Sequence, residues 1–197
     1  TYSGPFDEVF ATTQDGRTVG FVQRVGSGEA MVLGAAFPAN TLDDLDVLHQ
    51  MANRMGCAPL FTLTDWADVR LSRGEGGDFL FVANYLDDPI ETMIASSSGP
   101  LLGGAPVTLP ARRGVILPLE WQAAPGVQVH WLTAEVTDVI ADGARLLIKT
   151  DPAAFEAELT LDGYQVDNVL VVGLRNDGRV QLRGANGVIE LRAARGA

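Results

Sequence analysis

Two pairs of acidic residues have the types and spacing that could carry out acid–base chemistry. Two carboxylates held a few ångströms apart are the working groups of glycosidases and acid proteases. Asp87 and Asp88 precede Pro89 in an expected turn, and Glu156 and Glu158 share one face of an expected strand, where solvated side chains are the simpler interpretation. Surface acids far outnumber catalytic ones. The sequence therefore predicts no catalytic pair among these residues.

The histidines and the cysteine do not form a recognisable nucleophilic site. His49 lies beside the apolar stripe of an expected helix, and His130 alternates with Val129 and Trp131, so we expect both to be packing or surface residues. The sequence contains no Gly-x-Ser-x-Gly and no His-Glu-x-x-His motif. Cys57 is the single cysteine, which excludes an intrachain disulfide, and we expect it to be buried and inert. We predict no catalytic residue, metal site or cofactor.

A glycine-rich segment, Gly26-Ser27-Gly28, could approach a phosphate through its backbone N–H groups. The known nucleotide fingerprints require such a loop to open a helix. Here the next element is an apolar strand expected from Ala30 to Ala36. The segment is therefore predicted to be a hairpin turn.

Aromatic side chains are the remaining candidates for a binding role. Trp66, Trp121 and Trp131, with Tyr85 and Tyr164, could present flat faces to sugar rings. The competing interpretation places Trp121 and Trp131 in the core on either side of a linker, and the low aromatic content of 7% favours it. Carbohydrate binding by the three tryptophans stays open as a hypothesis.

One helix is strongly predicted after residue 40. Thr41 provides N-cap chemistry, and Asp43, Asp44 and Asp46 lie in the first turns, where the helix dipole favours negative charge. Gly56 is a suitable stop. One apolar stripe runs along the helix, formed by Leu42, Leu45, Leu48, Met51, Ala52 and Met55.

The rest of the chain is predicted to be antiparallel β structure. Five short strands are expected between residues 68 and 119. Seven more are expected between residues 127 and 193, one of them from Gln165 to Leu174, and the hairpin signals between these seven are Asp142-Gly143, Asp162-Gly163, Asp177-Gly178 and Asn186-Gly187. The strand from Ala30 to Ala36 reads as covered on both faces, which indicates the last part of an α/β layer. The expected fold class is mostly β (α+β): residues 1–58 form the tail of an α/β domain with one main helix, followed by two small antiparallel β-sandwich modules at residues 59–124 and 125–197.

Charge and hydropathy narrow the range of partners. The 197 residues carry 25 acids and 14 bases, a formal net charge of −11, and 47% are hydrophobic. Excess negative charge disfavours nucleic acid and anionic membrane surfaces as partners. No apolar run approaches the ~18 residues of a membrane span. A cytoplasmic location is favoured.

Four segments, in this order, match the pattern of a known family: Arg24 to Gly34 (RVGSGEAMVLG), a helix ending at Met55-Gly56-Cys57, Asp78 to Tyr85 (DFLFVANY), and Leu109 to Leu119 (LPARRGVILPL). This order resembles the C-terminal region of bacterial β-galactosidases of glycoside hydrolase families thirty-five and forty-two. There, a glycine-bounded apolar strand closes an α/β domain similar to glutamine amidotransferases, and a Phe-Leu-Phe-x-x-Asn strand leads into a small β-sandwich. The resemblance covers roughly residues 18 to 120.

The resemblance implies that this chain is not itself catalytic. In those enzymes the two catalytic glutamates stand on an upstream TIM barrel, which would be the main partner here, and Phe79, Phe81 and Asn84 match scaffold positions. Because the sequence begins at Thr1 rather than Met, we expect a piece of a longer β-galactosidase-like hydrolase. The alternatives are an autonomous carbohydrate-binding module and a complete small assembly adaptor, and a second copy of the chain is a further candidate partner.

Overall fold

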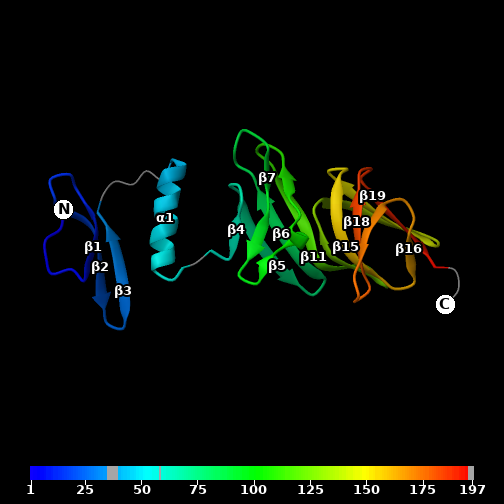
Figure 1. Cartoon of the computed structure of the whole chain (residues 1–197), viewed down its shortest axis with the longest axis horizontal. Helices are drawn as coiled ribbons and strands as arrows, with labels where there is room; N and C mark the ends of the chain where they lie inside the picture. The colour runs from blue at the N-terminus through cyan, green and yellow to red at the C-terminus, as the bar shows by residue number, and fades with distance from the viewer. Residues whose placement is uncertain (35–39, 58, 195–197) are drawn as a thin grey trace. The chain divides into compact units, whose positions relative to one another are not determined.

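The structure, a computed structural model, describes residues 1–34, 40–57 and 59–194. It is mostly β, and its described residues contain one α-helix. The chain divides into two compact units, Thr1–Pro59 and Leu60–Ala197, which are described separately below (Figure 1).

The first unit contains a three-stranded antiparallel sheet in the order β1 (Glu8–Thr12), β2 (Thr18–Val25) and β3 (Gly28–Leu33). Gly26 has a φ of 62°, in the left-handed region that glycine adopts without strain, and it turns the chain between β2 and β3. This confirms that the glycine-rich segment is a hairpin turn. The strand expected to be covered on both faces is β3, whose apolar residues are only half-buried, and the last two residues of that expected strand lie outside the described residues.

The predicted helix is confirmed as α1 (Leu42–Arg54). The Thr41 hydroxyl accepts a hydrogen bond from the Asp44 N–H, and the Asp44 carboxylate accepts from the Thr41 N–H, which together form a capping box. Gly56 follows with a φ of 76°, as expected for the stop. Cys57 is exposed, so the expectation of a buried thiol was wrong: the chain has left the helix at this point and the side chain has no core to enter.

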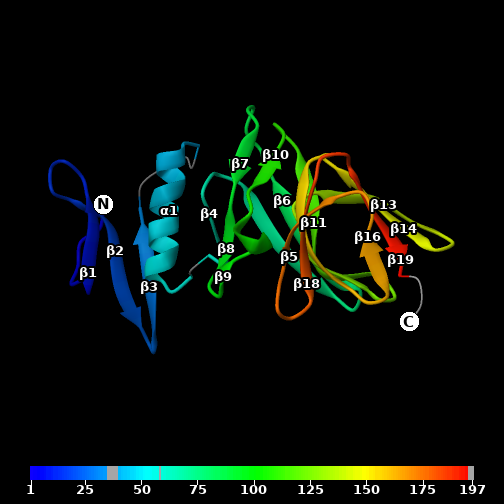
Figure 2. The same ribbon diagram turned by 45° about the vertical axis from the view of Figure 1, so that its right-hand side comes forward.

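The second unit is built around one long antiparallel sheet (Figure 2). Its seven strands are, in spatial order, β17 (Leu170–Leu174), β18 (Arg179–Gly184), β15 (Phe155–Leu161), β12 (Val127–Leu132), β11 (Gly114–Ala124), β6 (Gly77–Ala83) and β5 (Asp68–Gly74). Residues 124 and 125, where the two expected modules meet, lie at the hairpin between β11 and β12, and these two strands pair directly.

Three smaller sheets complete this unit. They contain β13 (Glu135–Asp142), β14 (Arg145–Asp151), β19 (Val188–Ala193) and β16 (Tyr164–Val166); β4 (Phe61–Leu63), β8 (Ile94–Ser96) and β9 (Gly99–Pro100); and β10 (Val107–Leu109) with β7 (Ile90–Thr92). A short 3-10 turn, η1 (Leu102–Gly104), follows β9.

Two separate hydrophobic clusters fill the unit, and both draw on the long sheet. One joins β12, β15 and β18 to the four-stranded sheet, with Val129, Leu159, Leu182, Ile148 and Leu191 among its fully buried members. The other joins β6 and β11 to the smaller strands, with Leu80, Leu117, Ile94, Leu102 and Leu109 among its buried members. Each half of the long sheet therefore has its own core.

Asn84 fastens the loops at the end of β6. Its side-chain carbonyl accepts from the Leu86 N–H at 2.8 Å, and its amide donates to the carbonyls of Asp88 at 2.8 Å and Pro110 at 3.1 Å. The residue is 1% exposed. These bonds satisfy backbone groups of two loops at once, so Asn84 has a structural role at the end of the strand.

Replacing Asn84 by alanine is expected to lower the free energy of unfolding by about 1–2 kcal/mol, because buried backbone groups lose their partners. Denaturant unfolding followed by tryptophan fluorescence measures the change. Asn168→Ala is the matched control, since Asn168 also bonds two backbone groups but in an exposed place, and a smaller loss is expected there. Equal losses in the two variants would contradict the buried-anchor role.

Candidate functional site

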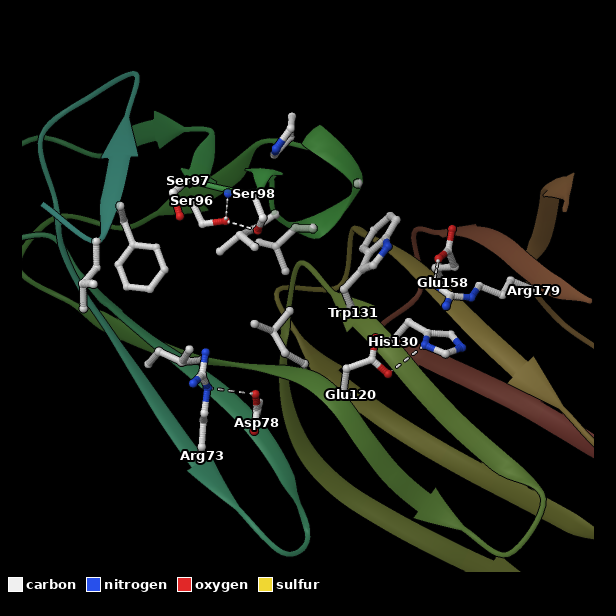
Figure 3. Close-up of a pocket in the computed structure, with 18 of the residues that line it drawn as sticks. Arg73, Asp78, Ser96, Ser97, Ser98, Glu120, His130, Trp131, Glu158 and Arg179 are labelled. Atoms are coloured by element: carbon white, nitrogen blue, oxygen red, sulfur yellow. Dashed lines mark hydrogen bonds and ion pairs between the residues drawn. The ribbon is translucent and has the colours of Figure 1, made fainter. Parts of the chain in front are cut away.

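A cleft of about 810 Å³ lies in the second unit, between the long sheet and the β8–β9 region (Figure 3). The strands of the long sheet contribute charged and aromatic side chains, and the segment from β8 to η1 contributes three serines and small apolar residues. The polar and aromatic lining residues are Arg73, Asp78, Ser96, Ser97, Ser98, Glu120, His130, Trp131, Glu158, Arg175 and Arg179.

Glu158 lies among the charged residues of the long sheet that line one side of the cleft. Although it is only 1% exposed, its carboxylate accepts from Arg179 Nη1 at 3.1 Å and Gln181 Nε2 at 3.1 Å, and it pairs with Arg175 Nε at 3.0 Å. The hydrogen bond from Arg179 to Glu158 is the main reason that the pKa of Arg179 is raised. The expectation that Glu156 and Glu158 both form a solvated face was wrong for Glu158, because two guanidiniums cover it.

His130 bridges two neighbouring strands of the long sheet. Its Nδ1 lies 2.9 Å from Glu120 Oε2, and its Nε2 lies 2.8 Å from Thr160 Oγ1. The expectation for His130 was a packing or surface role; its side chain is 10% exposed and forms part of the cleft wall. The order hydroxyl, imidazole, carboxylate matches that of a catalytic triad. However, Thr160 does not line the cleft, so a ligand held there does not meet its hydroxyl.

Glu120 holds this position through an unusual backbone conformation. Its φ is 45°, in the left-handed region, which is uncommon for a residue with a side chain. In the pairing of β11 with β12, Leu119 lies opposite Trp131 and Trp121 lies opposite Val129. Glu120 and His130 lie between these two pairs, so they are neighbours across the two strands. Strained residues of this kind cluster at ligand sites, and Glu120 is such a residue at the wall of a cleft.

The three tryptophans do not come together. Trp131 lines the cleft, and its ring packs over Gly103 of η1, where an added Cβ would lie 2.5 Å from Trp131 Cζ2. Trp121 lines a smaller, separate pocket and packs against the cluster of the four-stranded sheet. Trp66, in the loop before β5, is 38% exposed and lines none of the described pockets. Of the three candidates, only Trp131 stands beside charged and polar groups suited to a ligand.

A scan against protein-family models and a search of curated proteins found no match to this chain. Its function is therefore argued from its own residues.

The other acidic candidates lie away from the cleft. Asp87 accepts a hydrogen bond from Arg112 Nε at 2.5 Å, and this bond is the main cause that lowers the pKa of Asp87. Asp87 is therefore ionised at neutral pH and tied to the loop after β10. Neither it nor Asp88 lines the cleft.

Several polar groups of the cleft are bonded to one another. Ser96 and Ser98 share a hydrogen bond of 2.8 Å, and among described residues no serine of the cleft is hydrogen-bonded to a histidine or carboxylate. Glu158 is occupied by its ion pairs. The described residues also contain no group of three or more histidine, cysteine or acidic side chains arranged to hold a metal ion, and no described helix is long and apolar enough to cross a membrane.

The sequence interpretation took Glu158 for a solvated acid and missed Arg175 and Arg179, although a signal was present. Arg175 and Arg179 flank the Asp177-Gly178 turn, and the Arg175 N–H donates to the Arg179 carbonyl, so the two arginines face each other across a hairpin. Like charges directly opposite in a hairpin are destabilising unless an acid lies between them. Two arginines at this spacing therefore point to a nearby carboxylate.

Proposed function

We propose that this chain is a non-catalytic C-terminal accessory region of a β-galactosidase-like glycoside hydrolase. In this proposal residues 1–58 are the tail of an α/β domain, and residues 59–124 and 125–197 are two β-sandwich modules that brace the catalytic barrel of the same parent chain, shape one side of its cleft or mediate subunit contact. The two separate hydrophobic clusters of the second unit support the division into modules.

The observation that carries the proposal is the placement of the motif residues. Two of the four segments that resemble the hydrolase family form neighbouring strands, β6 and β11, in which Leu80 pairs with Leu117 and Phe81 with Ile116. Leu80 and Leu117 are fully buried. Leu80 and Leu117 thus place one face of this strand pair in the core, while Phe81 and Ile116 are exposed on the other face. A buried strand pair supports a scaffold role.

The proposal predicts that the isolated chain does not hydrolyse nitrophenyl β-galactoside. A retaining glycosidase needs a carboxylic acid and a carboxylate nucleophile on opposite sides of the glycosidic bond. In the described cleft Glu158 is paired with two arginines and Glu120 is hydrogen-bonded to His130, so neither is expected to serve in such a pair. Release of nitrophenol, followed by absorbance, is the measurement.

Turnover that disappears in Glu120→Gln or Glu158→Gln would overturn the proposal. The coding sequence upstream of Thr1 provides an independent test. A reading frame of several hundred residues with the pattern of a TIM barrel supports the accessory role, and a nearby start codon contradicts it.

A further inference from the structure

The charges of the cleft are balanced within the cleft itself. Glu158 pairs with Arg175 and Arg179, and Asp78 lies 3.6 Å from Arg73. Glu120 is hydrogen-bonded to His130. The lining holds three arginines and three carboxylates, with Arg175 and Arg179 sharing Glu158, so an ionic ligand meets no net opposite charge that would offset its desolvation. A neutral ligand has no such cost.

The paired groups still have hydrogen-bonding capacity to offer. A guanidinium carries five N–H donors in a fixed plane, and Arg175 contacts Glu158 through Nε while its side chain is 52% exposed. Ser96, Ser97 and Ser98 add hydroxyls, which both donate and accept, on the opposite wall. A ligand with several closely spaced hydroxyl groups could bond to both walls.

Apolar side chains line the rest of the cleft. They are Phe61, Leu71, Leu101, Leu102, Leu119 and Trp131. Its volume of about 810 Å³ falls within the range of small-molecule sites, roughly 300–1,000 Å³. The ligand that fits is neutral, rich in hydroxyls at its edges and apolar on its faces.

The wall that carries the charged residues offers no free sheet edge to an extended peptide. Extended peptides commonly dock by adding a strand to a free sheet edge. The strands that supply Glu120, His130, Trp131 and Glu158 are β11, β12 and β15, and each is paired on both sides in the long sheet. Their backbone groups are already used, so recognition here depends on side chains.

We propose that this cleft is a binding site for a neutral saccharide. A pyranose ring packs its C–H face against Trp131 and the neighbouring leucines, and its hydroxyls bond to Arg175, Arg179 and the serines of the β8–β9 turn. This site is independent of the accessory-region proposal, because it rests on the cleft rather than on the motif strands.

The test is a titration of the full chain with lactose, β-1,4-galactotriose, maltotriose and cellotriose, followed by isothermal calorimetry and tryptophan fluorescence. Trigalacturonate serves as the charged counterpart. We expect saturable binding of at least one neutral sugar, accompanied by a change in tryptophan fluorescence. Binding of trigalacturonate without binding of any neutral sugar would contradict the proposal that the ligand is neutral. If none of the sugars binds, the proposal of a saccharide site in this cleft is wrong.

Matched arginine variants locate the binding. Arg179→Gln is expected to weaken binding about tenfold or more, because a hydrogen bond from a charged donor is lost. Arg183→Gln is the control: Arg183 lies on the same strand, pairs with Glu156 and does not line the cleft. Ser97→Ala, an exposed change with little effect on folding, is expected to weaken binding in the same direction. Wild-type affinity in both Arg179→Gln and Ser97→Ala, or equal weakening in Arg183→Gln, would contradict the location.

If every sugar fails to bind while the upstream frame encodes a barrel, the accessory-region proposal stands and the saccharide site falls. If a sugar binds and the upstream frame holds a nearby start codon, the saccharide site stands and the accessory-region proposal falls. The two proposals are therefore tested separately.

Discussion

Replacement of both Arg175 and Arg179 by methionine is expected to lower the free energy of unfolding by about 3 kcal/mol. The two changes leave Glu158 buried, at 1% exposure, with Gln181 as its remaining side-chain hydrogen-bond partner among the described residues. Removal of one side of a buried ion pair costs about 3–5 kcal/mol, because the charge left behind has neither water nor a counter-ion. The arginines themselves are 52% and 36% exposed, which places the effect at the low end.

A third substitution, Glu158→Gln, is expected to restore most of the lost stability. It removes the unpaired negative charge of Glu158 while keeping the shape of the side chain and its capacity to hydrogen-bond to Gln181. Urea unfolding of the double and triple variants measures the difference. Arg183→Met is the control, since its partner Glu156 is 37% exposed and the loss there is expected to stay below about 1 kcal/mol. A triple variant less stable than the double would show that Glu158 is not a buried charge held by the two arginines.

Residues close together in the sequence were sufficient to predict the helix and two of the hairpins. The helix follows from Thr41, the apolar stripe and Gly56, which act within a few residues of one another. The Asp142-Gly143 and Asp177-Gly178 turns were predicted as hairpins, and they do join paired strands, β13 to β14 and β17 to β18. Such features need no knowledge of the rest of the chain.

Similar turn residues at two other places have a different role. Asp162-Gly163 joins β15 to β16, and Asn186-Gly187 joins β18 to β19, and in each case the two strands belong to different sheets. The segment from Gln165 to Leu174 was predicted as one strand and is instead divided into β16 and β17, again in different sheets. A turn dipeptide specifies a reversal of the chain, whereas the choice of sheet depends on which core the next strand can enter.

The burial of Glu158 could not be predicted from its own strand. In the segment from Phe155 to Leu161, Phe155, Ala157 and Leu159 alternate toward the core, so Glu156 and Glu158 share the outer face, as predicted. The Glu156 side chain remains partly exposed to solvent. Glu158 is covered by Arg175 and Arg179, which lie on a hairpin that follows later in the chain. The difference between the two acids is thus a long-range one, and the cleft wall depends on it.

Gly184→Ala is expected to destabilise the second unit by about 3 kcal/mol. Gly184 is a buried residue of β18, directly opposite Phe155 of β15 in the sheet. The Phe155 ring lies over Gly184, in the place that an added Cβ would occupy. Phe155 is 3% exposed and packed in the cluster shared with the four-stranded sheet, so it cannot swing into solvent without leaving the core. Overpacking of this kind costs about 1–3 kcal/mol, and the severity of this overlap favours the upper end.

The overlap with Phe155 can be separated from the general effect of replacing a glycine by alanine. Gly76→Ala is the matched control, because Gly76 has no neighbour within 4 Å of an added Cβ, and near-neutral stability is expected. Adding Phe155→Leu to Gly184→Ala returns space to the core, so the double variant is expected to be more stable than the sum of the two single losses. Thermal and urea unfolding of the four variants supply the cycle. If Gly184→Ala behaves as Gly76→Ala does, or if the two losses simply add, then the ring of Phe155 does not rest on Gly184.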